Sequence, residues 1–342
     1  MESRMLTKTG NTDNRRVTVK VPASTANLGP GFDSLGMALS LFAWVEMSES
    51  RTGETSFRLY GEGMDGLPRD KSNLIYKVAQ LVFDEAGVSV PELDIAMYSD
   101  IPLTRGLGSS ASAIIGALVA ANALIGSPLG DDKLFQLATA LEGHPDNVGA
   151  SLFGGIVVAA WDGESAHYAR IEPHARLETL VAIPAFQLST EKARHALPSQ
   201  LSMADAVYNV GRSSLLVAAL AGGELELIRH AMKDRLHQPY RAALIPGMTE
   251  ILERATEFGA LGAALSGAGP TLIAFVDAAS SSKAELERFL QETLRKEGIE
   301  AETMWLAPCG CGPAVTVEQL PDAQAVADAP TLLDRIKGEV KA

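Results

Sequence analysis

Glycine and serine are concentrated in residues 105–113, RGLGSSASA, which follow a predicted strand and begin a predicted helix. Gly106 and Gly108 have no Cβ atom, so a phosphate group can approach the backbone closely there. The free N–H groups and the dipole of a helix start favour anions, and serine hydroxyls add donors and one potential metal ligand. These residue types in this place predict a loop that binds polyphosphate. Its serines are Ser109, Ser110 and Ser112.

Two other interpretations of this loop stay open on the sequence alone. The letters GLGSSA also fit the dinucleotide-binding pattern G-x-G-x-x-A, which needs an acidic residue at the end of the next strand. Asp131 and Asp132 have about the right separation, but they begin a predicted helix. The other alternative is a glycine-rich helix start that packs on a sheet and binds nothing. The P-loop pattern G-x-x-x-x-G-K-[ST] is absent.

Two further glycine-containing stretches accompany this loop, PASTANLGPGFDSLG at 22–36 and LSGAGPTLIAF at 265–275. Each alone could be only a turn. In this order and at these separations, the three stretches resemble the three motifs of the galactokinase, homoserine kinase, mevalonate kinase and phosphomevalonate kinase superfamily. The resemblance runs from about residue 17 to residue 275. Three more stretches are similar to the homoserine kinase family in particular: EGHPDNV (142–148), STEKAR (189–194) and HQPYRAALIPGM (237–248).

The resemblance implies an enzyme that uses ATP and Mg²⁺ to phosphorylate the side-chain hydroxyl of L-homoserine, a step of threonine biosynthesis in the cytoplasm. It implies an α+β fold of two domains. The N-terminal, ATP-binding domain would resemble part of a ribosomal protein, and the C-terminal domain would be a ferredoxin-like α/β sandwich. Relatives also suggest a homodimer.

The substrate pocket is implied residue by residue. By resemblance, Asp33 binds the ammonium group of the substrate and Asn27 lies near its hydroxyl end. Arg194 and Arg241 are the candidates for the carboxylate, because a guanidinium can hold a carboxylate by two parallel hydrogen bonds. Without the surrounding motifs, the Asp would read as a helix cap and each Arg as a surface charge. Further implied substrate contacts are His144, Asn147 and Thr190, and the implied catalytic residues are Asn27, Asn147 and Arg241.

Glu142 and Ser110 are the predicted magnesium ligands, since magnesium takes few protein oxygens and completes its shell with water and phosphate. Asn73 resembles an adenine-side contact. The third motif, residues 266–270, is predicted to shape the floor of the site and to pack against the phosphate loop. The ATP-binding residues implied are Asn73, Pro102, Leu103, Thr104, Arg105, Gly106, Leu107, Gly108, Ser109, Ser110, Ala111 and Ser112.

One departure within the superfamily bears on mechanism. Mevalonate-type members place an Asp that serves as a base about where this sequence has Asn147. An Asn side chain cannot accept the proton, and the neighbouring Asp146 is expected to point elsewhere from a loop. We therefore predict direct attack by the hydroxyl, positioned by Asn27 and Asn147, without a dedicated protein base, as a loose phosphoryl-transfer transition state allows.

Predicted strands and helices must position these residues. They alternate in both halves of the chain, which predicts two α/β sandwich domains. The domains are predicted at 16–170 and 171–325, between tails at 1–15 and 326–342. Strands are predicted at 15–23, 39–48, 55–63, 92–103, 155–161, 177–185, 262–277 (two strands) and 301–308. The longer helices are predicted at 70–87, 104–126, 131–143, 203–223, 245–260 and 281–298, with a loop at 144–155.

Bulk properties exclude several classes of function. The formal net charge of −13 argues against nucleic acid as a partner. No apolar run of about 18 residues occurs, so no membrane span is predicted, and the polar start is unlike a signal peptide. Cys309 and Cys311 are predicted to be ordinary thiols of a reducing compartment.

Two alternatives to the first functional hypothesis remain. Another kinase of the superfamily, such as a mevalonate-pathway kinase, would also need carboxylate-binding arginines, but mevalonate offers no cation for Asp33. A non-catalytic relative that binds a ligand or partner would be expected to lack Ser110, Glu142 or the loop glycines, and all are present.

Overall fold

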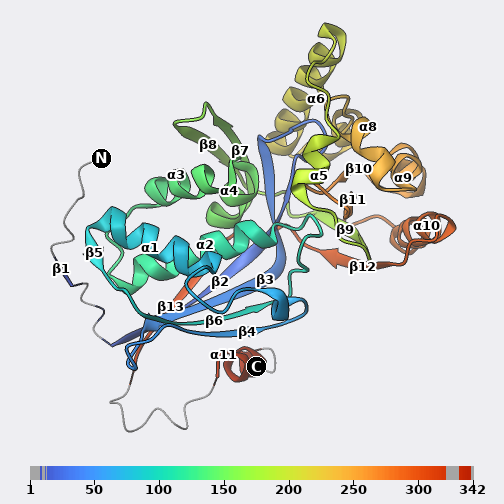
Figure 1. Cartoon of the computed structure of the whole chain (residues 1–342). Coiled ribbons are helices and arrows are strands. Elements are labelled where there is room, and N and C mark those ends of the chain that lie inside the picture. The colour runs from blue at the N-terminus through green and yellow to red at the C-terminus, as the bar shows by residue number, and fades with distance from the viewer. Residues whose placement is uncertain (1–7, 10–11, 13, 321–330, 340–342) are drawn as a thin grey trace.

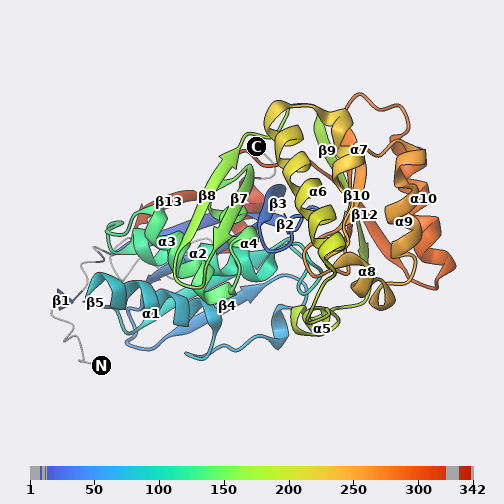
Figure 2. The same ribbon diagram turned by 90° about the horizontal axis from the view of Figure 1, so that it is seen from above.

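The computed structural model describes residues 8–9, 12, 14–320 and 331–339, which form two units, each built on one large β-sheet (Figures 1 and 2). The first sheet runs in the order β13-β2-β3-β6-β4, and β7 and β8 continue from the other end of β3. Its strands are β2 (Arg15–Ala26), β3 (Leu35–Glu49), β4 (Ser56–Tyr60), β6 (Leu93–Ser99), β7 (Ile156–Trp161), β8 (Ala166–Ile171) and β13 (Ala314–Gln319).

Four helices cover one face of this sheet (Figure 1): α1 (Leu74–Ala86), α2 (Ser109–Leu124), α3 (Asp131–Glu142) and α4 (Asp146–Phe153). The helix α2 is the most buried, and Gly116 lets it approach the sheet: a Cβ there would lie 2.6 Å from Cγ2 of Val45. Alternate residues of β2, such as Val17 and Val19, are fully buried beneath it. The start of α2, which carries the serines of the phosphate loop, is therefore held rigidly against the sheet.

The second sheet has the order β10-β11-β9-β12, with all neighbours antiparallel. Residues of β9 alternate between its faces: Leu180 packs toward α9 and α10, whereas Val181 packs toward the first unit. The chain order of strands and helices is the ferredoxin-like βαββαβ pattern, as predicted. The strands are β9 (Leu177–Pro184), β10 (Gly262–Leu265), β11 (Leu272–Asp277) and β12 (Ala301–Leu306), and two of the helices are α9 (Met248–Arg254) and α10 (Lys283–Lys296).

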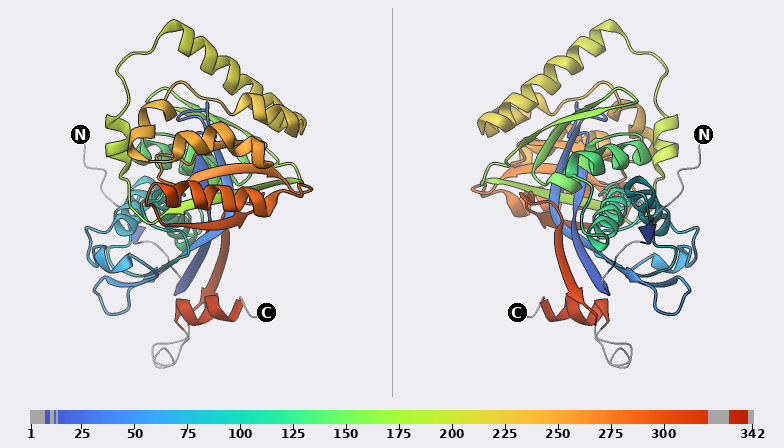
Figure 3. Two further views of the ribbon diagram at one scale, coloured as in Figure 1. Left: turned by 90° about the vertical axis from the view of Figure 1, so that its right-hand side faces the viewer. Right: turned by 90° about the vertical axis from the view of Figure 1, so that its left-hand side faces the viewer.

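The remaining helices of the second unit follow β9, and the longest, α6, runs along the outer edge of this unit (Figure 3). They are α5 (Thr190–His195), α6 (Met203–Gly222), α7 (Ile228–Ala231) and α8 (Gln238–Arg241). The short 3-10 helices are η1 (Met64–Gly66), η2 (Leu225–Leu227), η3 (Ala242–Leu244) and η4 (Ala255–Phe258). No helix among the described residues is long and apolar enough to cross a membrane.

Three predictions about organisation need correction. The segment 144–155 is not a loop, because α4 begins at Asp146 and runs to Phe153. The predicted C-terminal domain at 171–325 contains β13, which returns to the first sheet and pairs with β2. The predicted tails are partly structured. Residues 8–9 (β1) pair in parallel with β5 (Val88–Ser89), and residue 15 already belongs to β2. The C-terminal tail contains the helix α11 (Leu332–Glu339). Residues 1–7, 10–11, 13, 326–330 and 340–342 of the two tails lie outside the described residues.

The helix α11 lies on the face of the first sheet opposite α1–α4 (Figure 1). Leu332 and Ile336 pack against Trp44 of β3 and the neighbouring aromatic side chains. Arg335 forms an ion pair with the buried Glu46, which Arg58 also approaches. An unpaired carboxylate would be costly at such a buried position, so the ion pair fixes α11 to this place on the sheet.

Candidate active site

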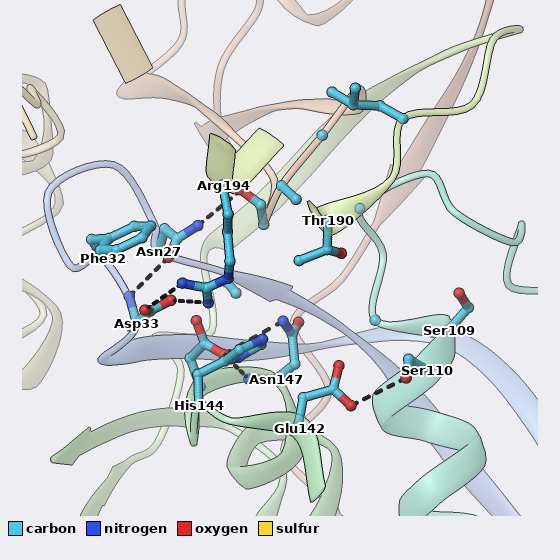
Figure 4. A pocket seen from close by; sticks show the side chains of 18 of the residues that line it. Asn27, Phe32, Asp33, Ser109, Ser110, Glu142, His144, Asn147, Thr190 and Arg194 are labelled. Atoms are coloured by element: carbon cyan, nitrogen blue, oxygen red, sulfur yellow. Dashed lines mark hydrogen bonds and ion pairs between the residues drawn. The ribbon is translucent and has the colours of Figure 1, made fainter. Parts of the chain in front are cut away.

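A cavity of about 120 Å³ lies where the two units meet (Figure 4). It is lined from the first unit by the first glycine motif, the phosphate loop and the α3–α4 connection, and from the second by α5, α8 and the third motif. The structure thus brings most of the predicted site residues to one place. Those lining the cavity are Asn27, Asp33, Thr104, Gly106, Gly108, Ser109, Ser110, Glu142, His144, Asn147, Thr190, Arg194 and Arg241.

The phosphate loop is shaped by close contacts to the first and third motifs. Gly106 has φ +83°, and a Cβ there would lie 2.4 Å from the carbonyl oxygen of Ser266. Ser266 donates a hydrogen bond to the Gly106 carbonyl at 2.6 Å, so the third motif packs against the loop as predicted. Gly108 has φ +72° and caps α2, and a Cβ there would lie 2.1 Å from Oγ of Ser24. Only glycine fits either position.

Some residues predicted to bind ATP face away from the loop's open side. Ser112 is fully buried and donates to the Ser109 carbonyl at 3.0 Å, and Leu107 and Ala111 are buried in the core. Arg105 donates to the carbonyl oxygens of residues 184 and 186, which ties the loop to the second unit. These residues support the loop, and the side chains available to a ligand are those of Ser109 and Ser110.

A second cavity of about 240 Å³, mostly apolar, adjoins the loop and is lined by Leu59, Leu67, Pro68, Asn73, Leu74, Ile75, Met97, Leu103, Thr104, Ser109, Ser110 and Ala113. Asn73 lines it, but its side chain accepts from Ile75 N at 2.9 Å and donates to Pro68 O at 2.6 Å. Its polar atoms therefore serve to cap α1. Pro102 lies apart, in a separate cavity with Leu103 and Arg105.

Glu142 ends α3 directly opposite the start of α2. Ser110 donates to Oε2 of Glu142 at 3.1 Å (Figure 4). Burial raises the pKa of Glu142, although His144 and Ser110 oppose the shift. A half-buried carboxylate that lies beside a serine hydroxyl at the phosphate loop is a donor set that suits a magnesium ion.

Asp33 and Arg194 join the two units by a bidentate ion pair. The guanidinium nitrogens Nη1 and Nη2 of Arg194 lie 3.0 and 2.8 Å from the two carboxylate oxygens (Figure 4). The two residues are predicted to bind opposite charges of a substrate, and in this structure they bind each other. Asp33 has φ +55°, and its N–H donates to Oδ1 of Asn27 at 3.0 Å.

Asn27, which is predicted to contact the substrate hydroxyl, lines the cavity and makes two hydrogen bonds within the protein. Its Nδ2 donates to Gly267 O at 2.8 Å, and its Oδ1 accepts from Asp33 N. The amide nitrogen therefore holds the first motif against the third, and the amide oxygen braces the first motif internally. Thr190, the first residue of α5, lines the cavity with its side chain directed toward it (Figure 4).

Three neighbouring polar side chains lie at the start of α4: His144, two residues before the helix, and Asp146 and Asn147, its first two residues. Nδ1 of His144 lies 2.5 Å from Oδ1 of Asp146, and the same oxygen accepts from Asn147 N at 2.7 Å. Ser24 donates to Oδ1 of Asn147 at 3.0 Å. Burial alone would lower the pKa of His144, but the carboxylates of Asp146, Glu142 and Asp33 together outweigh it, so the pKa is raised. Asp146 lines the cavity, so the expectation that it points elsewhere is wrong. A helical first turn, where a loop was predicted, turns it inward.

Arg241 is almost fully buried, with 2% of its surface exposed. Its Nε donates to Ala193 O at 3.1 Å, and its guanidinium lies 5.3 Å from the centre of the Phe32 ring. Arg194 also stacks on Phe32, at 5.6 Å. Sequence reasoning missed Phe32, although it directly precedes Asp33 in the first motif. Desolvation and the like charge of Arg194 lower the pKa of Arg241 to about 10, so the guanidinium stays charged at neutral pH.

The two units correspond to two parts of one known class of kinase. Residues 73–155 match the GHMP kinases N terminal domain, and residues 216–296 match GHMP kinases C terminal. A mevalonate kinase of known structure has the same fold, with a TM-score of 0.59 at 18% identity over 85% of this chain and 99% of that one.

Homoserine kinases are far more similar in sequence. That of Moorella thermoacetica is 46% identical over 87% of this chain and 99% of its own, and that of Deinococcus radiodurans is 46% identical over 85% and 94%. The crystal structure of homoserine kinase from Cytophaga hutchinsonii superposes with a TM-score of 0.76 at 28% identity, covering 88% of this chain and 97% of that one. The chain belongs to the homoserine kinase family of the GHMP kinases.

Proposed function

We propose that this chain transfers the γ-phosphoryl group of ATP to the side-chain hydroxyl of L-homoserine, with Mg²⁺, to give O-phospho-L-homoserine. The observation that carries the proposal is one cavity with a phosphate loop and a carboxylate at one end, and paired acidic and basic groups at the other. In a zwitterion with a terminal hydroxyl, the ammonium and carboxylate groups match the acidic and basic side chains, and the hydroxyl matches the end with the phosphate loop. Relatives that carry the name homoserine kinase support the same reaction.

The phosphate groups would lie on the backbone of residues 106–110, where glycines allow close approach and the start of α2 supplies N–H donors. Ser110 and Glu142 would hold Mg²⁺, which would neutralise charge on the transferred group. The adjacent apolar cavity beside Leu59 and Met97 is suited to a flat adenine ring.

The charged groups of the substrate would bind Asp33 and Arg194, which pair with each other in this structure. The ammonium group would bind Asp33, whose carboxylate lies within 4.8 Å of ligand atoms of His144 and Asp146. The carboxylate would bind Arg194 and Arg241. This arrangement would direct the hydroxyl toward the phosphate loop, and positioning of this kind is the main catalytic contribution in phosphoryl transfer.

For the hydroxyl proton, we retain direct attack without a dedicated base. Oδ1 of Asp146 already accepts three hydrogen bonds, one from His144 and two from Asn147, and Asn147 cannot take a proton. The variant Asp146→Asn should therefore keep measurable turnover. Loss of turnover, with binding of ATP and L-homoserine intact, would identify Asp146 as the base and overturn direct attack.

The first test is release of ADP from ATP and Mg²⁺ with L-homoserine, L-serine, L-threonine or mevalonate at equal concentrations. Turnover with L-homoserine alone is expected, and it would place the enzyme in threonine biosynthesis. Turnover with mevalonate alone would keep the phosphate site and refute the proposed pocket. The cytoplasmic location and a homodimer belong to the same proposal, and light scattering of the purified protein checks the dimer.

A further inference from the structure

His237 is fully buried between the first motif and α8, and nothing above gives it a role. It begins the stretch HQPYR and directly precedes α8, which carries Arg241. One ring nitrogen, Nε2, lies 2.8 Å from the carbonyl oxygen of Gly29. The other, Nδ1, lies 3.1 Å from Nη1 of Arg241. The imidazole therefore bridges the loop that carries Asp33 to the most buried arginine of the site.

The partners fix the protonation of this ring. An arginine guanidinium can only donate, so Nδ1 of His237 must be the acceptor, and Nε2 carries the hydrogen that it donates to Gly29. The ring is thus neutral, which agrees with burial lowering the pKa of His237. Asp234 lies 3.7 Å from Nε2, but its carboxylate accepts N–H bonds from residues 236, 237 and 238 and so caps the turn before α8.

The same contacts fix the orientation of Arg241. Nε donates to Ala193 O, and Nη1 donates to both His237 and Gly267 O, the latter at 3.2 Å. For Nη2, no hydrogen bond to the described residues is recorded, although the side chain is 2% exposed and lines the active-site cavity. A buried guanidinium with one free NH₂ group toward a cavity is prepared to bind an anion there.

We propose that His237 is a positioning residue for Arg241. Its Nδ1 holds Nη1, so that Nη2 faces the cavity and binds the carboxylate of the amino-acid substrate. The proposal rests on the proposed function for the presence of that carboxylate. His237 does not touch the substrate, and it acts only through the orientation of the guanidinium.

Two substitutions separate the two bonds of the ring. In His237→Asn, the amide oxygen takes the place of Nδ1, so the acceptor for Arg241 remains and the bond to Gly29 is lost. In His237→Gln, the amide reaches the position of Nε2, so the donor to Gly29 remains and the acceptor is lost. The two variants are similar in polarity and differ in which partner they keep.

The substrate can be varied in the same experiment. The compound 3-aminopropan-1-ol is homoserine without its carboxylate, so it cannot report on Arg241. We expect His237→Gln to raise KM for L-homoserine ~10- to 100-fold, as loss of a hydrogen bond to a charged group predicts. KM for ATP and kcat should change less than about threefold, and His237→Asn should raise KM for L-homoserine far less. With 3-aminopropan-1-ol, as substrate or as inhibitor, neither variant should differ from the wild type.

Other outcomes would overturn the proposal. Equal losses in the Asn and Gln variants, or equal losses with both compounds, would show that His237 only supports the fold around Gly29. Thermal melting of each variant identifies any that fails to fold. If one variant does not fold, the other still tests the proposal, because its KM for L-homoserine can be compared with its KM for 3-aminopropan-1-ol. The wild type is measured first with L-homoserine, so a failure of the proposed function is seen separately, before any variant is compared.

Discussion

Some side chains in the cavity bind each other directly, and a substrate would have to replace these contacts with its own. The pair of Asp33 and Arg194 is the clearest case, because each oxygen of the carboxylate meets its own guanidinium nitrogen. Lysine presents one point charge and cannot reproduce a bidentate contact. We expect Arg194→Lys to raise KM for L-homoserine roughly 10-fold while KM for ATP stays the same, as steady-state kinetics would show. An unchanged KM for L-homoserine would exclude Arg194 from the carboxylate site. Arg254→Lys, at the end of α9 and outside the cavity lining, is the matched control.

Glu142 is the acidic side chain next to the phosphate loop, with Ser110 as its partner. Replacing it by Gln keeps the shape and removes the charge that would hold Mg²⁺. Glu142→Gln should lower kcat by roughly 100-fold or more and raise the Mg²⁺ concentration needed for half-maximal rate. Glu164→Gln, in an exposed turn, should have no effect. A Glu142→Gln variant with normal magnesium dependence would contradict the assignment.

At the level of elements, the phosphate loop depends on the close approach of three motifs. Gly106→Ala would place a Cβ 2.4 Å from a backbone carbonyl, in a backbone conformation that already disfavours alanine. Gly87, at the end of α1, also has a positive φ, but nothing lies within 4 Å of its hypothetical Cβ. Gly87→Ala should cost only about 1–2 kcal/mol of unfolding free energy. Gly106→Ala should cost more and also raise KM for ATP; equal effects in both variants would refute the contact argument.

The attachment of α11 should depend on pH. Thr331 and Asp334 bond to each other at the start of this helix, and the hydrogen bonds from Thr331 lower the pKa of Asp334. A carboxyl group with a lowered pKa in the folded state stabilises that state above its ordinary pKa, and this stabilisation is lost as pH falls through the lowered value. Trp44, beneath α11, should therefore change fluorescence on acidification below about pH 4.

The control for this prediction is Asp334→Asn, which should weaken the attachment at neutral pH and reduce its response to acid. Trp44 is read in a variant with phenylalanine at positions 161 and 305, so that it is the fluorescent tryptophan. Catalytic rates should stay as in the wild type, since α11 lies on the face of the sheet opposite α2 (Figure 1). A fluorescence signal that is constant from pH 6 to 3 would contradict the argument.

Elements whose signal is local could be predicted from the sequence, and those set by distant partners could not. The buried alternation of β2 and the amphipathic face of α1 are properties of their own residues, and both elements form near the predicted positions. The short helix α4 has a proline before it and two glycines after it, which resemble a loop. The strand β13 is exposed along its length, so its apolar pattern gives no sign of its distant partner β2.

In the active site too, features with a local sequence signal could be predicted, and contacts between distant residues could not. The glycine motifs and the charged residues were predicted because their types and order are distinctive. Which of them bind each other, such as Asp33 with Arg194, depends on contacts across 161 positions of the chain. Phe32, Asp146 and His237 were missed as parts of the site because each has an ordinary structural explanation when it is considered alone.

For the whole molecule, the two units should unfold together. The chain enters the second unit after β8 and returns to the first sheet at β13, so neither unit is a separate stretch of chain. Trp44 lies in the first sheet and Trp305 in the second. Variants that keep only Trp44 or only Trp305, with Trp161 replaced by phenylalanine in both, should give the same midpoint in urea, measured by fluorescence. Two separate midpoints would show that each sheet is stable without the other.

The return of β13 also affects how the protein is made. Chains leave the ribosome N-terminus first, and β13 lies at residues 314–319 of 342. While the whole second unit emerges, β2 must therefore wait with an open backbone edge, which another chain could pair with. The unit whose synthesis begins first is therefore completed late, because the emergence of β13, rather than that of the first 170 residues, sets the earliest moment at which its sheet can be complete.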